Sequence, residues 1–216
     1  MIMEDRILLK GVLHGSLPAF KKLISEYIPL VSRTSYRILC DRSDSEFVTR
    51  EVFVFLWHDP LSFMTDKQLS HELLKRTCRF CRRRLMKRRL YNIFSIHPDI
   101  FVVQAYGEYS QEEYIARQVW QVFCRASLHC TDRQRVIYTL CELEDVPVSA
   151  AAEVGYYLPF AVEEALEEAR LRVREELDRY GRIGDYDAYV GYLRNVVSQL
   201  TDKKRLMNNI MQEIFS

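Results

Sequence analysis

Seven basic residues lie within eleven positions of the chain, and their type and spacing suggest contact with phosphate groups. They are Arg79, Arg82, Arg83, Arg84, Lys87, Arg88 and Arg89. On a helix these positions cover more than one face, so a small core cannot pair all of them. The planar guanidinium group holds phosphate oxygens through two parallel hydrogen bonds, so this density of arginine is typical of a nucleic-acid contact. The alternative is a solvated basic face.

Aromatic residues accompany the basic run. Phe80 lies within it, and Tyr91 and Phe94 follow shortly after. Single-stranded DNA is held by cations along its backbone and by aromatic rings on which its bases stack. We therefore predict a DNA-binding surface on this helix. The predicted residues are Arg79, Phe80, Arg82, Arg83, Arg84, Lys87 and Arg88.

Other residue patterns give no prediction of catalysis or of a cofactor. Cys78 and Cys81 form a C-x-x-C pair, but Cys124 and Cys130, with His129 beside them, have poor spacing for the second half of a zinc site. We expect buried or interfacial thiols and no metal. The sequence contains no zinc-protease helix, nucleophile elbow or glycine-rich nucleotide loop. We predict that the protein is not an enzyme and needs no cofactor.

Size and composition indicate an ordered protein. The chain has 216 residues, of which 48% are hydrophobic, with seven Gly and six Pro. No apolar run approaches the roughly 18 residues that span a membrane. The first residues lack the basic and apolar regions of a signal peptide. Because the six cysteines are scattered, we interpret them as reduced thiols of a cytoplasmic protein.

The net charge of +1 conceals two oppositely charged parts. Residues 1–95 carry 18 Lys and Arg against 10 Asp and Glu, a net charge of +8. Residues 96–180 carry 8 against 16, a net charge of −8, and residues 181–216 carry 5 against 4. This asymmetry favours two domains that have different partners or that attract each other.

The first half of the chain is expected to be helical. Apolar spacing predicts a helix over 17–39, in which Pro29 is expected to start a second helix. Ser43 and Glu46 are predicted to form a capping box that opens a helix ending at His58. A third helix is expected over 69–91.

The second predicted helix contains the run VFVFLW at 52–57, which is apolar on every face. A buried strand is the alternative interpretation, but the length of the segment favours a helix. Such a helix is either buried or docked against a partner. Because Phe53, Phe55, Leu56 and Trp57 cannot all face one small core, we expect at least one to be well exposed.

The second half predicts a helix-turn-helix. A helix begins near Glu112, and Thr131 with Gln134 forms a second capping box. A short helix AAAEV, a break at YYLP and a long helix from about Phe160 follow. The long helix has an apolar stripe of Val162, Leu166, Ala169, Val173 and Leu177. Two further short helices are expected in the tail.

Four segments, in this order, resemble the bacterial sigma factors of RNA polymerase. SDSEFVTREVFVFLWHDP resembles an acidic-then-apolar sigma helix, and ELLKRTCRFCRRRLMKRR is similar to the helix that follows it. ASLHCTDRQRVIYTLCELEDVPVSAAAEVG and VEEALEEARLRVREEL resemble the beginning and the last helix of the sigma helix-turn-helix domain. The layout is similar to that of the extracytoplasmic-function group, and the resemblance covers residues 10–180.

The resemblance implies an all-α protein with two small helical domains. These are a sigma region 2-like bundle at 1–95 and a region 4-like helix-turn-helix domain at 112–180, joined by a linker at 96–111 and followed by a helical extension at 181–216. It also implies transcription initiation through core RNA polymerase and promoter DNA, the DNA contact lying mainly in 1–95. An anti-sigma protein is a further candidate partner. The expected polymerase-binding residues are Glu46, Arg50, Glu51, Phe53, Phe55, Leu56 and Trp57.

The last helix of the predicted helix-turn-helix departs from the family pattern. Basic or polar positions that face phosphates in the family are Glu163, Glu164, Glu167 and Glu168 here. Four carboxylates near a helix N-terminus repel phosphates, so we predict that this helix does not read DNA and instead meets the arginine-rich helix of the same chain. A solvated acidic helix is the alternative. The alternative function is therefore a degenerate sigma paralogue or an adaptor, which binds polymerase or a regulatory protein without reading the minus-thirty-five element.

Overall fold

The computed structural model describes residues 3–90, 111–180, 185–196 and 203–215, and within these ranges it is helical and contains no strand. The predicted all-α class is confirmed. No helix in these ranges is long and apolar enough to cross a membrane. The elements are α1 (Met3–Leu13), α2 (Leu17–Leu39), α3 (Arg42–His58), the 3-10 helix η1 (Pro60–Phe63), α4 (Leu69–Leu90), α5 (Gln111–Leu128), α6 (Asp132–Tyr138), the π-helical turn η2 (Thr139–Leu143), α7 (Val148–Gly155), α8 (Pro159–Tyr180), α9 (Tyr186–Val196) and α10 (Lys203–Phe215).

Local sequence signals explain most helix boundaries, with two corrections. Helix α2 runs unbroken through Pro29, so the expected second start at this proline is wrong. Helix α3 begins at Arg42, because Asp41 is its N-cap and accepts a hydrogen bond from the Asp44 amide at 2.8 Å. The predicted Ser43–Glu46 capping box is therefore also wrong. A cap two residues earlier satisfies the free amides of the helix start equally well.

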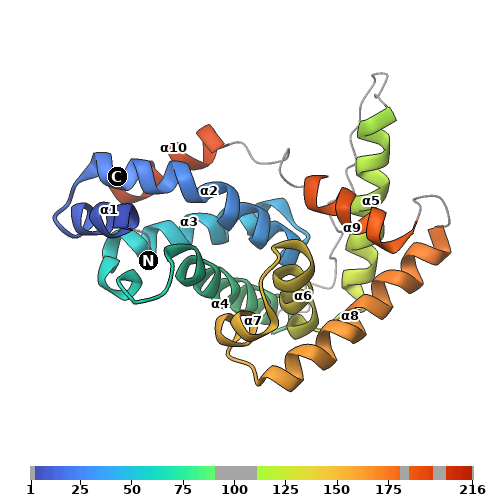
Figure 1. Cartoon of the computed structure of the whole chain (residues 1–216). Helices are drawn as coiled ribbons and strands as arrows, with labels where there is room; N and C mark the ends of the chain where they lie inside the picture. Colours follow the sequence, from blue (N-terminus) through green and yellow to red (C-terminus); the bar gives the residue numbers. More distant parts are fainter. Residues whose placement is uncertain (1–2, 91–110, 181–184, 197–202, 216) are drawn as a thin grey trace.

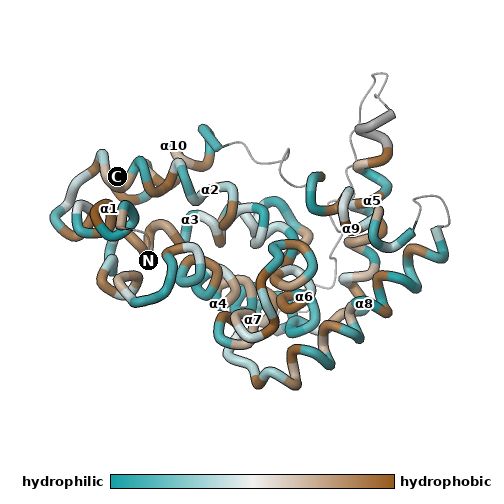
Figure 2. Tube along the Cα trace, viewed as in Figure 1, coloured by the Kyte–Doolittle hydropathy of each residue, from teal (hydrophilic) through white to brown (hydrophobic). Residues whose placement is uncertain are grey.

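The predicted elements of the second half agree with the structure. Thr131 and Gln134 form the expected capping box, with reciprocal hydrogen bonds of 3.2 and 2.7 Å. The predicted apolar stripe of α8 is buried along its whole length. Figure 2 shows hydrophobic and hydrophilic positions alternating along this helix, as expected of a helix with one buried face. Gln111, the last residue of the predicted linker, begins α5, and the rest of 96–111 lies outside the described residues.

The helices pack in two groups (Figure 1). In the N-terminal helix group, α1, α3, α4 and α10 pack around α2 or against one another. In the C-terminal helix group, α5, α6 and α7 contact α8, and α9 lies on α5. The predicted division into two domains and a linker stays a prediction, because the groups are in contact in this structure.

The tail contributes a helix to each group. Helix α9 is held in the C-terminal helix group, where the Tyr189 hydroxyl donates to the Val119 carbonyl at 3.2 Å. Helix α10 instead packs against α2 and α3 in the N-terminal helix group. Figure 1 shows α10 beside α2, well separated from α9. The last helix of the chain therefore reaches back to its first half.

Candidate functional site

The basic residues of α4 divide into two sets, and the outward set forms a stripe. Arg79, Arg83 and Lys87 are exposed and follow one another at four-residue spacing, so they share one face of the helix. None of the three has an acidic partner within the described residues. Phe80 is half-buried beside them, and the Arg83 guanidinium carbon lies 5.7 Å from its ring centroid. We call Arg79, Phe80, Arg83 and Lys87 the cationic stripe.

The other predicted DNA-binding residues are used by contacts within the chain. Arg84 pairs with Asp44 at 2.5 Å, and Arg88 pairs with the same aspartate and donates to the Leu39 carbonyl at 3.2 Å. These bonds fix α4 to the beginning of α3. Arg82 points to the C-terminal helix group, where it donates to the Gly155 carbonyl at 3.0 Å. The available cations are therefore fewer than the sequence suggests.

The apolar run of α3 is more buried than expected. Phe53 and Leu56 have no exposed surface and belong to the core, so in this conformation they cannot contact a partner. Phe55 and Trp57 are half-buried. The Phe55 ring lies 4.4 Å from the Arg76 guanidinium carbon. The expectation that one of these four side chains would be well exposed is wrong, because α2, α4, α10 and η1 pack against this part of α3.

The polar residues predicted to bind polymerase lie on the outer side of α3, and α10 covers two of them. Glu46 accepts a hydrogen bond from Arg42 at 3.1 Å and also pairs with Arg205 of α10. Arg50 pairs with Glu213 of α10. Glu51 is half-buried. The chain's own C-terminal helix thus covers part of the predicted docking face.

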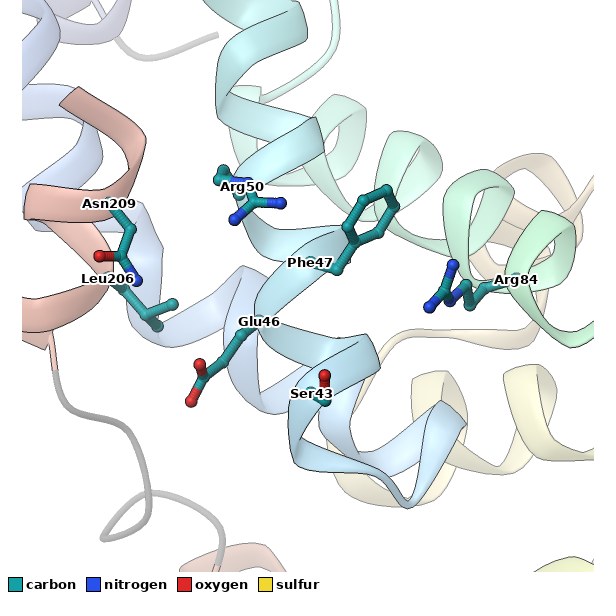
Figure 3. Close-up of a pocket in the computed structure, with 7 residues that line it drawn as sticks. All are labelled: Ser43, Glu46, Phe47, Arg50, Arg84, Leu206 and Asn209. Atoms are coloured by element: carbon teal, nitrogen blue, oxygen red, sulfur yellow. The ribbon is translucent and has the colours of Figure 1, made fainter. Parts of the chain in front are cut away.

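A small pocket of about 200 Å³ lies where α3, α4 and α10 meet (Figure 3). Its lining residues are Ser43, Glu46, Phe47, Arg50, Arg84, Leu206 and Asn209. Figure 3 shows Phe47 between Arg50 and Arg84, whose guanidinium carbons lie 5.4 and 4.9 Å from its ring centroid. Phe47 is 37% exposed, which makes it the exposed aromatic residue of α3. The sequence analysis did not predict Phe47 as a site residue.

The acidic helix α8 does not meet the arginine-rich helix, which overturns that prediction. Glu163, Glu164, Glu167 and Glu168 are all exposed. Two of them have partners within the C-terminal helix group. The Gln134 amide donates to Glu168 at 2.5 Å, and Glu167 pairs with Arg170. The face stays outward because the opposite, apolar face of α8 is the one that the core requires.

Helix α4 and the residues just before it instead contact the C-terminal helix group through α6, α7 and the turn after α7. Lys67 pairs with Glu153 at 3.0 Å, and Arg82 donates to the Tyr157 hydroxyl at 3.1 Å. The Lys75 ammonium lies 5.0 Å from the Tyr156 ring centroid. A Cβ at Gly155 would lie 2.4 Å from the Tyr157 ring, so the ring would have to move to accept any larger residue there. The arginine-rich helix therefore does meet the C-terminal helix group, but at α6 and α7 and not at the acidic face of α8.

A buried ion pair that the sequence did not reveal joins the two groups. Glu144 accepts hydrogen bonds from Arg33 at 2.7 Å, Arg37 at 2.8 Å and the Thr34 hydroxyl at 3.1 Å. The side chains of Arg37 and Glu144 are 1% and 2% exposed. Burial lowers the pKa of Arg37, and the charge of Glu144 opposes that effect. No sequence signal marks this contact, because its partners lie more than a hundred positions apart.

The turn between α7 and α8 carries an exposed apolar cluster that sequence reasoning also missed. Tyr156, Leu158 and Phe160 are 63%, 62% and 67% exposed. Large apolar side chains gathered on a surface are typical of interaction sites. The break YYLP in the sequence was a signal for the turn but was not interpreted as a surface.

The prediction that the thiols of Cys78 and Cys81 are buried agrees with the structure. Cys78 and Cys81 are fully buried in α4, and burial raises the pKa of Cys78 to about 12.

Comparison with models of protein families and with curated proteins finds no match to this chain.

Proposed function

We propose that the protein is a sigma-factor-like transcription initiation protein that binds core RNA polymerase and promoter DNA. In this proposal, the outer side of α3 binds the polymerase and α4 holds DNA. The ordered resemblance of four segments to sigma factors supports the proposal. So does the arrangement of α3 and α4, which pack against each other and are fixed by Asp44, Arg84 and Arg88.

The observation that carries the proposal is the cationic stripe. Its three cations lie on one helical face and have no acidic partner in the part of the chain that the structure describes, so they can contact the phosphate backbone of a nucleic acid without breaking an ion pair there. The half-buried ring of Phe80 lies among them and offers a surface on which a base can stack. These are the two elements that binding of single-stranded DNA requires.

The test compares two full-length variants that change the net charge equally. Arg79→Glu, Arg83→Glu and Lys87→Glu reverse the cationic stripe. The matched control reverses three exposed cations on α1 and α2 by Arg6→Glu, Lys10→Glu and Lys21→Glu. Binding of a fluorescent single-stranded oligonucleotide is measured against salt concentration.

We expect the stripe variant to lose at least about tenfold in affinity, with a salt slope reduced by about two, because three phosphate contacts are gone. The control should lose much less. Equal losses in the two variants would show that DNA responds only to the total charge, and the assignment to α4 would fail.

The acidic outer face of α8 favours a second candidate function. It makes reading of duplex DNA by this helix unfavourable, while the adjacent apolar cluster is suited to a protein partner. The protein would then be a degenerate sigma paralogue that binds polymerase or a regulatory protein without reading the minus-thirty-five element. Binding of promoter duplex that depends on residues of α8 would exclude this candidate.

A further inference from the structure

Helix α10 lies on α3 as an amphipathic helix lies in a groove. Leu206 and Ile210, one turn apart, are 3% and 0% exposed against α2 and α3. Met207, Met211 and Ile214 pack partly buried beside them. The opposite side of α10 is polar, with Lys203, Lys204 and Asn208 exposed. The surface formed by α2 and α3 is therefore one that accepts a helix with an apolar stripe.

The ends of α10 are fixed by contacts to residues that the sequence assigned to polymerase binding. Arg205 pairs with Glu46, and Glu213 pairs with Arg50. At the last turn the Phe215 ring packs edge-on against Trp57, with centroids 5.2 Å apart. These contacts involve three of the seven predicted polymerase residues. While α10 is in place it covers part of the surface of each of these three residues.

The attachment of α10 is weak compared with the packing of the core helices. Two of its side chains are buried, its ion pairs are partly open to water, and Phe215 remains 53% exposed. Exposed ion pairs contribute little to stability, and segments with few buried apolar contacts open most easily. Helix α10 therefore has fewer fully buried side chains to hold it than α2 or α3 of the same group has.

We propose that α10 is a competitor within the chain for the partner-binding face of α3, and that the partner must displace it. The proposal rests on the proposed function, because it takes that partner to be core RNA polymerase. If only the molecules whose α10 has left α3 can bind the partner, the apparent affinity equals the intrinsic affinity multiplied by the fraction of such molecules. Release of α10 therefore raises the affinity of the chain for polymerase.

The test uses full-length variants with changes in α10 alone, so the predicted polymerase contacts on α3 are untouched. Ile210→Asp places a charge in the buried contact, and Arg205→Glu sets a like charge against Glu46. The matched control is Lys204→Glu, which makes the same charge change at the neighbouring exposed position. Two quantities are measured for each variant: amide hydrogen exchange of 203–215, and affinity for purified core RNA polymerase.

We expect faster exchange and at least about tenfold tighter polymerase binding in Ile210→Asp and Arg205→Glu, with no change in the control. A synthetic peptide of residues 203–215 should weaken the binding of the released variants again. If exchange rises while a measurable polymerase affinity stays the same, the competitor role is wrong and the proposed function remains. If exchange rises and no variant binds polymerase, the proposed function itself is wrong. Unchanged exchange in both variants would show that these contacts do not hold α10, which also overturns the inference.

Discussion

Neutralising Glu144 should destabilise the whole chain, because this side chain balances a buried charge between the two helix groups. In Glu144→Gln, Arg37 keeps its charge at 1% exposure but loses its counter-charge. Removal of one partner from a buried ion pair costs about 3–5 kcal/mol. Arg33, the second partner, is 35% exposed, so water screens its share and the lower value of about 3 kcal/mol is expected. That is a large part of the roughly 5–15 kcal/mol that stabilises a typical protein.

Urea unfolding measures this cost directly. The two tryptophans report on both groups, because Trp57 lies in α3 and Trp120 in α5. The free energy of unfolding of Glu144→Gln is compared with that of the parent and of Glu175→Gln. The control removes an exposed pair with Arg172, whose loss should cost less than about 1 kcal/mol. A loss in Glu144→Gln no larger than in the control would refute the argument that this ion pair joins the groups.

Two further predictions follow from the burial of α3 and α4. Phe53→Ala should lower the free energy of unfolding by about 3–5 kcal/mol, because Phe53 has no exposed surface. The control Phe47→Ala, at an exposed position of the same helix, should lower it by less than about 1 kcal/mol. Equal losses for the two variants in urea unfolding would contradict the burial of Phe53. Cys78 and Cys81 should resist iodoacetamide at pH 8. Burial raises the pKa of both thiols, to about 12 for Cys78, and so keeps them neutral at this pH. Half-buried Cys141 should react before Cys78 and Cys81, although burial raises its pKa to about 11. Mass spectrometry measures the order of labelling, and labelling of Cys78 before Cys141 would disprove this prediction.

Local signals in the sequence predicted the helices because each depends on neighbouring residues. The Thr131 capping box and the α8 stripe that begins at Val162 involve residues a few positions apart. The error at Pro29 has a similar origin. A proline favours a helix start locally, but burial of Ile28 and Val31 on either side keeps α2 continuous.

The contacts between distant segments could not be predicted in the same way. Charge counts indicated that a basic part and an acidic part would attract each other. They could not show that Glu144 rather than Glu163 would meet the arginines, because that choice depends on which face of each helix the core buries. The position of α10 on α3 likewise follows from the apolar spacing of Leu206 and Ile210 only once the accepting surface is known.

The most direct test of the account measures the binding of the purified chain to purified core RNA polymerase by fluorescence anisotropy. Three proteins are compared: the parent, the single variant Ile210→Asp, and a double variant that carries both Ile210→Asp and Glu51→Arg. Glu51 lies on α3 and has no ion-pair partner within the described residues, so its replacement should leave the fold intact. The account predicts a saturable complex with a Kd of about 1 µM or tighter for Ile210→Asp, weaker binding by the parent, and a clear loss when Glu51 is reversed. No complex with either the parent or Ile210→Asp would contradict the central claim that α3 binds the polymerase.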